Sequence, residues 1–192
     1  MKRQMGMHSH VWNEDAAKRL LQKGREQSED ASFLDRTIGP KKQVIADLGC
    51  GPGFYASKLK KFASVLYCID SSKAMISVAR KRIHGKTVKF LEEDSSRTSL
   101  PDASVDIVFM ANSFHDMERE KTAAEIKRIL KPEGKVIVVD WKKGARLGSE
   151  EHRGPPESLR MSESEYLEWF PGFKIKDRFE AGADHFGMVL AR

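Results

Sequence analysis

The hydrophobic positions of this chain fall into short apolar runs that alternate with longer amphipathic stretches. The short runs predict strands at 44–48, 64–70, 87–93, 105–111 and 135–141. The longer stretches space their apolar residues as a helix does, and they predict helices at 54–62, 71–83 and 117–130. Strands that are apolar on both faces and alternate with helices favour a parallel sheet covered by helices.

The two ends of the chain depart from this alternation. Residues 13–38 have a helical pattern that Gly24 interrupts and that the GPKK stretch ends. A helix predicted at 161–170 precedes two strands, FKIKDRFEA and HFGMVLAR, with no helix between them. Two such strands indicate an antiparallel hairpin that closes one sheet edge. The polar stretch 142–160 contains Gly-Pro-Pro and predicts a long surface loop, a kind of segment that is often functional.

Composition narrows the class of protein. The chain has 192 residues, of which 40% are hydrophobic and 32% charged, as expected for one globular domain with a full core. No apolar run approaches the about 18 residues of a membrane span, and the N-terminal stretch lacks the apolar core of a secretory signal. We therefore expect a cytoplasmic protein. Cys50 and Cys68 form no CxxC pair, so zinc and redox motifs are absent and both residues are predicted to be buried.

Positive charge is concentrated in one part of the chain. The net charge is +6, and residues 43–90 hold nine Lys or Arg but only two acids. The runs KLKK at 58–61 and RKR at 80–82 are either solvated helix faces or a surface that attracts an anionic partner. These runs contain no interleaved aromatic residues, and no nucleic-acid-binding module is recognisable. The charge pattern therefore does not favour specific nucleic-acid binding.

The stretch ADLGCGPGFY places Gly49, Gly51 and Gly53 between a predicted strand and a predicted helix. In an open parallel sheet, ligands bind at the carboxyl ends of the strands and near helix N-termini. Glycines there let the main chain approach a ligand closely. The spacing is GxGxG, with Phe54 where the dinucleotide fingerprint has its third glycine, so the fit to nicotinamide or flavin binding is poor.

Acidic residues follow the next two predicted strands. Asp70 ends the strand at 64–70, where a carboxylate can accept two hydrogen bonds from a ribose diol. Asp94 follows the strand at 87–93, where a carboxylate can accept a hydrogen bond from the exocyclic amine of adenine. Together with the glycine stretch, these acids describe a pocket for an adenosine that carries a polar tail.

This ordered set resembles the motifs of class I S-adenosylmethionine-dependent methyltransferases. ADLGCGPG resembles the first motif, CID the ribose-binding acid, EEDSSRTSLPDASVDIVF the adenine-binding segment, and LKPEGKVIVVDW the segment around the fifth strand. The resemblance is close over residues 40–141. It is nearest to the type 11 group, which includes the ubiquinone/menaquinone-biosynthesis methyltransferases.

The resemblance implies a Rossmann-like α/β fold with a seven-stranded, mostly parallel sheet and helices on both faces. The implied strand order is 3-2-1-4-5-7-6, with the last strand antiparallel. A single domain would span 1–192. Its parts would be an N-terminal helical segment or lid at 1–40, a cofactor-binding core at 41–141, and an acceptor-side loop, helix and closing hairpin at 142–192.

The resemblance also implies S-adenosylmethionine as cofactor and S-adenosylhomocysteine as product. The implied cofactor-binding residues are Asp47, Gly49, Gly51, Gly53, Asp70, Ser71, Met75, Asp94, Ser95 and Asn112. Asp47 is expected near the ammonium group of the cofactor, and its alternative role is a strand-end acid that caps the loop. Met75 either lines the adenine side or packs in the core. No metal site is expected.

Methyl transfer mainly requires that the acceptor atom be aligned with the methyl group in a dry site. A base is needed only when the acceptor must lose a proton. ANSFHDM at 111–117 follows the fourth predicted strand and lacks the Asn/Asp-Pro-Pro-aromatic signature of many amino methyltransferases. His115 is the candidate base, since a histidine with a pKa near 6.5 accepts protons close to neutral pH. Its alternative is a structural hydrogen-bonding role or a place in the lining near the cofactor. Asp116 either orients His115 or caps the next helix.

Other segments are expected to shape the pocket. Val11 and Trp12 are candidates for a lid, whereas His8 and His10 are too closely spaced to predict a metal pair. Trp141 and the loop at 142–160 are predicted on the acceptor side, where His152 and Arg153 either meet an anionic acceptor or are simply solvated.

The sequence therefore predicts methyl transfer to an O, C or N atom of a small molecule. Arsenite methylation is not expected, because that activity uses several cysteine thiols. One alternative is an RNA or protein methyltransferase that uses the basic surface at 58–89. The other is a module that binds S-adenosylmethionine without catalysis. The sequence does not predict the identity of the acceptor or the oligomeric state.

Overall fold

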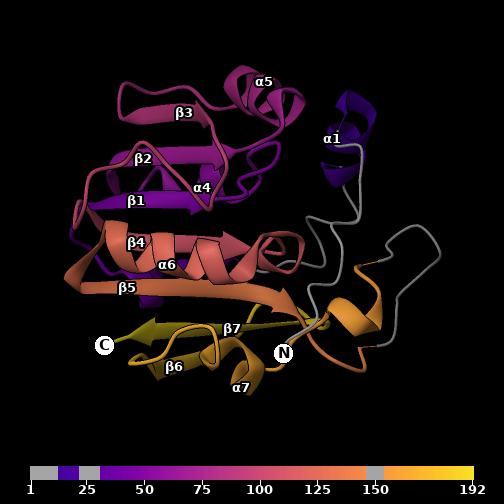
Figure 1. The fold of residues 1–192 in the computed structure, drawn as a ribbon. Helices are drawn as coiled ribbons and strands as arrows, with labels where there is room; N and C mark the ends of the chain where they lie inside the picture. Colours follow the sequence, from indigo (N-terminus) through magenta and orange to yellow (C-terminus); the bar gives the residue numbers. More distant parts are fainter. Residues whose placement is uncertain (1–12, 22–30, 146–153) are drawn as a thin grey trace.

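The computed structural model describes residues 13–21, 31–145 and 154–192. These residues form a seven-stranded sheet in the order β3-β2-β1-β4-β5-β7-β6 (Figure 1). The strands are β1 (Gln43–Leu48), β2 (Ala63–Asp70), β3 (Val88–Glu92), β4 (Val105–Ala111), β5 (Leu130–Trp141), β6 (Lys174–Glu180) and β7 (His185–Ala191). Strands β1 to β5 pair in parallel, and β7 is antiparallel to both β5 and β6. The predicted order and closing hairpin are confirmed.

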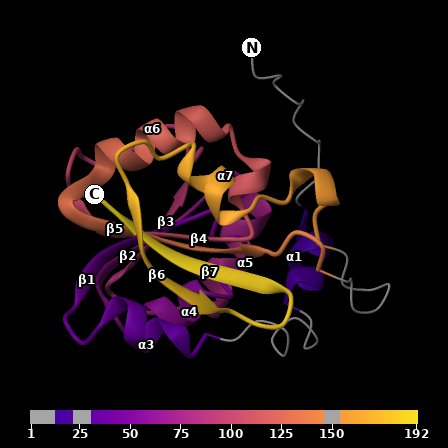
Figure 2. The same ribbon diagram turned by 90° about the horizontal axis from the view of Figure 1, so that it is seen from below.

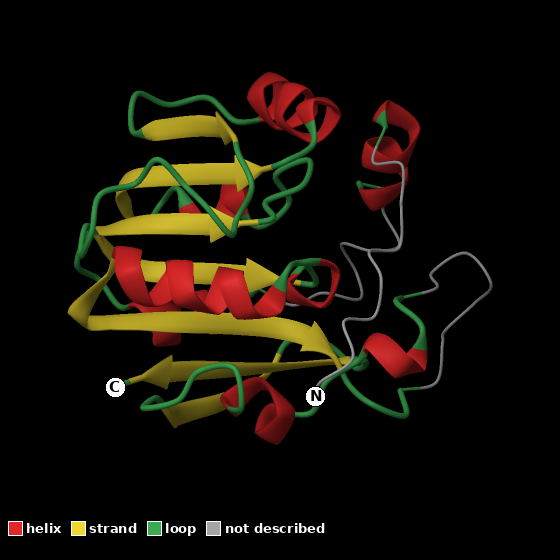
Figure 3. Cartoon of the chain, in the orientation of Figure 1, coloured by secondary structure: helices red, strands yellow, loops and turns green. Residues whose placement is uncertain are grey.

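Helices cover both faces of this sheet, as predicted. They are α1 (Glu14–Leu20), α3 (Phe33–Ile38), α4 (Ala56–Leu59), α5 (Lys73–Arg82), α6 (Arg119–Ile129) and α7 (Glu163–Leu167). Figure 2 shows α3 and α4 on one face and α6 and α7 on the other. Figure 3 gives the same arrangement by type of secondary structure.

The strand pattern explains why both faces are covered. Ile45 in β1 packs with Phe33 and Leu59 on the α3–α4 face, whereas its neighbour Ala46 packs with Ile126 and Tyr166 on the α6–α7 face. Successive side chains of a strand point to opposite faces, so an apolar run without polar gaps must bury both. The two hydrophobic clusters thus draw on opposite faces of the sheet, and the loops at its carboxyl edge are left to form a site.

Predicted helices extend beyond the observed ones, and the helix predicted at 161–170 is limited to α7. The helix predicted at 54–62 is limited to α4, and the residues on either side form turns. The helix predicted at 117–130 ends at Ile129, and β5 begins at Leu130, before Pro132 and Gly134. The pairing of β5 with β4 skips from Leu130 to Lys135, so the proline lies in an irregular stretch where no ladder hydrogen bond from its nitrogen is needed.

The short helix α7 begins with a capping box. Ser162 accepts a hydrogen bond from the main-chain N–H of Glu165, and the Glu165 carboxylate accepts one from the N–H of Ser162. This local arrangement satisfies two of the free donors at the helix start. It fixes the direction in which α7 presents Tyr166 to the sheet.

Candidate active site

The glycine stretch forms the turn that leaves β1. The main-chain N–H groups of Gly49 and Cys50 donate to the carbonyl of Ile69 over 2.8 and 3.0 Å, which ties the turn to the end of β2. Gly49, Gly51 and Gly53 have φ angles of 69°, 54° and 87°. Residues with a side chain rarely adopt these values, so the turn depends on glycine at each position.

The three glycines differ in what lies beside them. A Cβ at Gly49 would lie 2.6 Å from Cβ of Ser113, and one at Gly53 would lie 2.4 Å from Cδ1 of Ile83. A Cβ at Gly51 would meet no atom within 4 Å. Gly49 and Gly53 therefore serve protein packing, and Gly51 is the point where the main chain remains open to a ligand.

Asp70 lies at the end of β2, beside this open point. Its Oδ2 accepts a hydrogen bond from the N–H of Gly51 at 2.9 Å, and its Oδ1 accepts one from the N–H of Ser72 at 2.8 Å. Burial raises the pKa of Asp70, and these two N–H donors partly oppose that rise. Each carboxylate oxygen keeps a further lone pair, so the side chain is held in place and can still accept hydrogen bonds from a diol.

Asp47 is the most perturbed acid of the site. It is 2% exposed, and within the described part of the chain its Oδ2 has no hydrogen-bond partner. Burial, together with the negative charge of Asp70, raises the pKa of Asp47 to about 8. A buried carboxylate without a partner costs stability unless a cation reaches it. The pair of acids therefore favours a ligand with a positive charge near Gly51.

The predicted adenine-side residues lie at the ends of β2 and β3. Asp94 is exposed and accepts a hydrogen bond from the N–H of Ser96 at 2.7 Å, and its neighbour Ser95 is 7% exposed. Ser71 is exposed directly after Asp70. Met75 is 2% exposed and packs against Ala16 and Ala17 of α1, which agrees with its core interpretation.

The segment after β4 lies against the glycine turn. Asn112 has a φ of 53°, and its N–H donates to the carbonyl of Val139 at 2.9 Å. The Ser113 hydroxyl donates to the carbonyl of Leu48 at 3.0 Å. The carboxyl ends of β1, β2 and β4 thus bring Asp47, Asp70 and Asn112 to one edge of the sheet.

His115 lies in a short 3-10 turn, Phe114–Asp116, next to this edge. Its Nδ1 is 3.4 Å from Oδ1 of Asp140, and its Nε2 is 3.7 Å from Oδ2 of Asp116. Burial alone would lower the pKa of His115, but Asp140 and then Asp116 favour the charged imidazolium and raise it above its ordinary value, against a small opposing effect of Arg119. The imidazole, in a side chain that is 6% exposed, is therefore basic and faces two acids.

Two residues near His115 were missed by the sequence reasoning. Asp140, 1% exposed at the end of β5, accepts hydrogen bonds from the Tyr166 hydroxyl and from the N–H of Trp141. Burial and the Asp140 charge hold the pKa of Tyr166 well above its ordinary value. The available signal was a lone carboxylate in the otherwise apolar run VIVVDW.

Aromatic and basic side chains order the residues that follow β5. The Trp141 ring lies 4.2 Å from the His185 ring and 5.4 Å from the guanidinium of Arg160, centroid distances in each case. Arg160 is 5% exposed and donates to the carbonyls of Pro155 and Ala145 at 3.1 Å each. These bonds join both described ends of the predicted acceptor-side loop. The predictions for His8, His10, Val11, Trp12, His152 and Arg153 lie outside the described residues.

The basic runs KLKK and RKR contain no interleaved aromatic residue, but cations of the stretch 58–89 contact aromatic rings in the folded protein. These rings flank α4 in sequence or lie on strands β2 and β3. These pairs are Lys58 with Phe54, Lys61 with Phe62, Arg80 with Phe90 and Lys89 with Tyr67. Each pairing occupies a cation within the protein.

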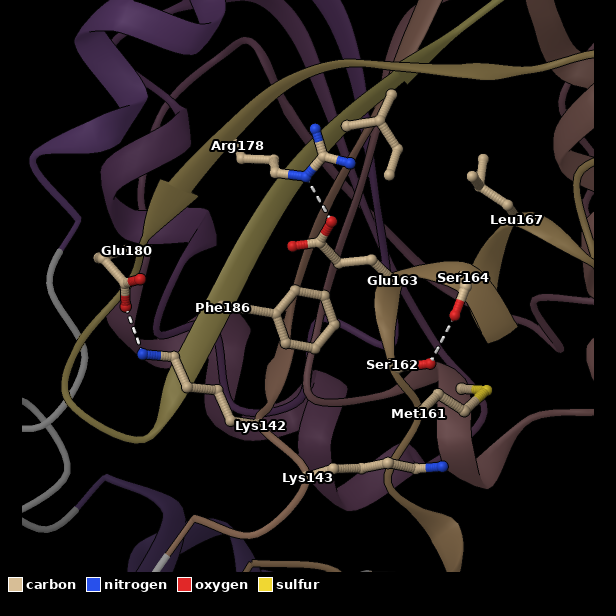
Figure 4. Close-up of a pocket in the computed structure, with 11 residues that line it drawn as sticks. Lys142, Lys143, Met161, Ser162, Glu163, Ser164, Leu167, Arg178, Glu180 and Phe186 are labelled. Atoms are coloured by element: carbon tan, nitrogen blue, oxygen red, sulfur yellow. Dashed lines mark hydrogen bonds and ion pairs between the residues drawn. The ribbon is translucent and has the colours of Figure 1, made fainter.

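A hollow of about 620 Å³ lies away from the glycine turn, between α7 and the β6–β7 hairpin (Figure 4). Phe186 lies in its wall, and the ion pairs Lys142–Glu180 and Arg178–Glu163 cross its rim. The mutual pairing of these charges leaves this hollow without the unpaired acid that distinguishes the glycine turn.

Two other kinds of feature, metal clusters and membrane-spanning helices, are absent from the described ranges. No group of three or more His, Cys, Asp or Glu side chains is arranged there to hold a metal ion. No helix in those ranges is both long and apolar enough to cross a membrane.

We predict that Asp47→Asn stabilises the ligand-free protein at pH 8. The folded-state pKa of Asp47, about 8, exceeds its ordinary value, so its contribution to stability is full at low pH and is lost as pH rises to about 8. Asparagine does not ionise, so the variant does not lose stability in this way. Its free energy of unfolding at pH 8 should exceed that of wild type by about 1–3 kcal/mol. Urea denaturation at pH 5 and pH 8 measures the difference.

Asp106→Asn is the matched control, because its effect should have the opposite sign. Burial opposes ionisation of Asp106, but Lys131 and the N–H of Val44 hold its pKa below the ordinary value. The control should destabilise the protein at neutral pH and lose that effect as pH falls. A pH-independent effect of Asp47→Asn would contradict the burial argument.

Comparison with known proteins finds a matching family model and similar solved structures. A methyltransferase-domain family model matches residues 46–138. A crystal structure from Sulfolobus solfataricus assigned to the type 11 methyltransferases is 40% identical, with a TM-score of 0.75, over 86% of this chain and 93% of that one. A S-adenosylmethionine-dependent methyltransferase from Aquifex aeolicus is 29% identical, with a TM-score of 0.81, over 93% and 97% of the two chains.

A curated relative gives a more distant match. The demethylmenaquinone methyltransferase of Thermus thermophilus is 30% identical over 66% of this chain, which spans 60% of that relative's length. The strand order, the glycine turn with its acids and these matches agree with one another. The chain belongs to the type 11 family of class I S-adenosylmethionine-dependent methyltransferases.

Proposed function

We propose that this protein transfers a methyl group from S-adenosylmethionine to an O, C or N atom of a small molecule. The observation that carries the proposal is the buried Asp47, whose Oδ2 lacks a hydrogen-bond partner in the described residues and which feels the charge of Asp70, the acid that holds the open Gly51. Asp70 adds an acceptor for a diol at the same place. An amino acid ammonium, a sulfonium and a ribose are the groups that these side chains would bind.

The donor set fits this cofactor. Asp47 would pair with the ammonium, Gly51 would leave room at the main chain, and Asp70 would accept hydrogen bonds from the ribose hydroxyls. Asp94 and Ser95 would meet the adenine. When bound, the cofactor supplies a methyl group on a positively charged sulfur, which is a strong electrophile.

His115 is proposed as the group that takes a proton from the acceptor. Its segment contacts the glycine turn through Ser113, and its imidazole is basic. A proton is taken most effectively by a group whose pKa is near the working pH. The residues around Trp141 would orient the acceptor.

A surface for RNA or protein acceptors is the second candidate. It rests on the basic stretch 58–89, where Arg80, Lys81 and Arg82 end α5. The aromatic rings under several of these cations also occur in nucleic-acid-binding surfaces. Charge reversal at these three residues tests the candidate, since it should abolish salt-dependent RNA binding if RNA is the acceptor.

Asp70→Asn should weaken S-adenosylmethionine binding at least tenfold while the protein stays folded. Loss of hydrogen bonds to a charged acceptor removes about 1.5–3 kcal/mol. Isothermal titration calorimetry measures the affinity, and Glu92→Gln is the control, because Glu92 is the exposed neighbour of Asp70 on β3. Unchanged affinity in Asp70→Asn would mean that the ribose is bound elsewhere. If the folded wild-type protein shows no saturable binding of S-adenosylmethionine, the proposed function itself is wrong.

His115→Ala should lower turnover about 10²–10⁴-fold, the usual contribution of a general base. Its S-adenosylmethionine affinity should stay within about twofold of wild type. Transfer of a labelled methyl group, with a demethylmenaquinone as the first acceptor tested, measures turnover, and His84→Ala is the control because His84 is exposed on the loop after α5. A loss of cofactor affinity instead would assign His115 a structural role on the cofactor side.

A further inference from the structure

A buried polar network connects three elements behind His115. The Tyr166 hydroxyl of α7 donates to Oδ2 of Asp140, and the Trp141 N–H donates to Oδ1 at 2.8 Å. The same Oδ1 faces Nδ1 of His115 at 3.4 Å. Tyr166 and Asp140 are 0% and 1% exposed, so the Asp140 carboxylate is enclosed by protein. It approaches His115 on the Nδ1 side of the ring.

Packing needs alone do not explain this network. A buried ionic group is seldom more stable than an apolar side chain of the same size, and a partly satisfied one is worse. Nδ1 of His115 is buried and lies beyond hydrogen-bond geometry from Asp140. Catalytic hydrogen bonds are often long in the ligand-free state and shorten when the reacting complex forms.

The geometry also assigns the two ring nitrogens. Nδ1 is 3.4 Å from the buried carboxylate of Asp140 and Nε2 is 3.7 Å from the carboxylate of Asp116, and we assign the proton of the neutral ring to Nδ1, the nitrogen nearer to an acid. Nε2 then has the free lone pair, and it lies on the side of Asp116, which is exposed. The charged groups that face His115 are Asp140 of β5, Asp116 of its own turn and Arg119 of α6, with Tyr166 of α7 behind Asp140.

We propose that Asp140 and Tyr166 are positioning residues that hold His115 with Nε2 ready to take a proton from an acidic O–H or C–H group of the methyl acceptor. This inference rests on the proposed function. The acceptor's O–H or C–H bond breaks, the proton goes to Nε2, and the electron pair stays on the oxygen or carbon as the nucleophile. The imidazolium afterwards returns the proton to water.

The inference narrows the acceptor class. A neutral amine already has a lone pair and gains little from a base before attack. A phenol, an enol or a carbon between two carbonyl groups must lose its proton first or during attack. The buried acid–imidazole pair therefore favours acceptors of this second kind, and oxygen or carbon becomes the methylated atom.

The test is an NMR titration of the full-length, cofactor-free protein with labelled histidine. In wild type, neutral His115 should carry its proton on Nδ1 and should titrate above its ordinary range. Asp140→Asn should lower the His115 pKa by about one pH unit or more and shift the proton towards Nε2. Tyr166→Phe, which keeps the ring packing, should change the pKa in the same direction by less.

The control is Asp106→Asn, which removes a strand carboxylate far from His115 and should leave both signals unchanged. If neither the pKa nor the tautomer of His115 responds to Asp140→Asn in a folded variant, the inference is wrong. A merely structural role for Asp140 would change stability without changing the tautomer.

A second experiment compares acceptors. Wild type should methylate phenol or 1,3-dicarbonyl probes, with a rate that rises through one ionisation near neutral pH, and Asp140→Asn should lose that rise. Faster transfer to simple amines, without pH dependence from His115, would overturn the inference. Calorimetry with S-adenosylmethionine alone tests the proposed function separately, so the two failures are distinguishable.

Discussion

A buried acid at the end of a central strand, with one oxygen that has no hydrogen-bond partner in the described part of the chain, is the constraint on which this structure depends. Asp47 follows a run of residues that are buried on both faces of the sheet, so water cannot compensate its charge. The negative charge of Asp70 on the next strand further opposes ionisation of Asp47. Burial of two neighbouring acids lowers the stability of the fold. The packing of the sheet and its two hydrophobic clusters offsets this cost and holds the glycine turn in place. The site is thus electrostatically prepared for a cationic ligand.

The second centre, around His115, lies at the same edge and is joined to the first by a short path. Ser113 contacts Gly49 and bonds to the end of β1, and two residues later His115 faces Asp140. The parallel sheet explains this closeness, since the carboxyl ends of β1, β4 and β5 lie side by side. One centre suits the binding of a positive charge, and the other suits the removal of a proton.

Much of the fold could be predicted from local pattern, and much of the site could not. The alternation of strands and helices and the final hairpin follow from apolar runs, and Asp70 and Asp94 follow from their places after strands. The separate roles of the glycines depend on Ser113 and Ile83, which are distant in sequence. Tyr166 reaches Asp140 across 26 residues, and only the packing of α7 on the sheet brings them together. The irregular start of β5 likewise depends on its pairing with β4.

Proton release on cofactor binding tests the central claim most directly. Calorimetric titration of S-adenosylmethionine at pH 7, in buffers of different ionisation enthalpy, counts the protons exchanged by wild type and Asp47→Asn. If Asp47 is protonated when free and pairs with the ammonium when bound, wild type should release more protons than the variant and bind at least tenfold more tightly. Equal proton exchange and equal affinity in the two proteins would contradict the account.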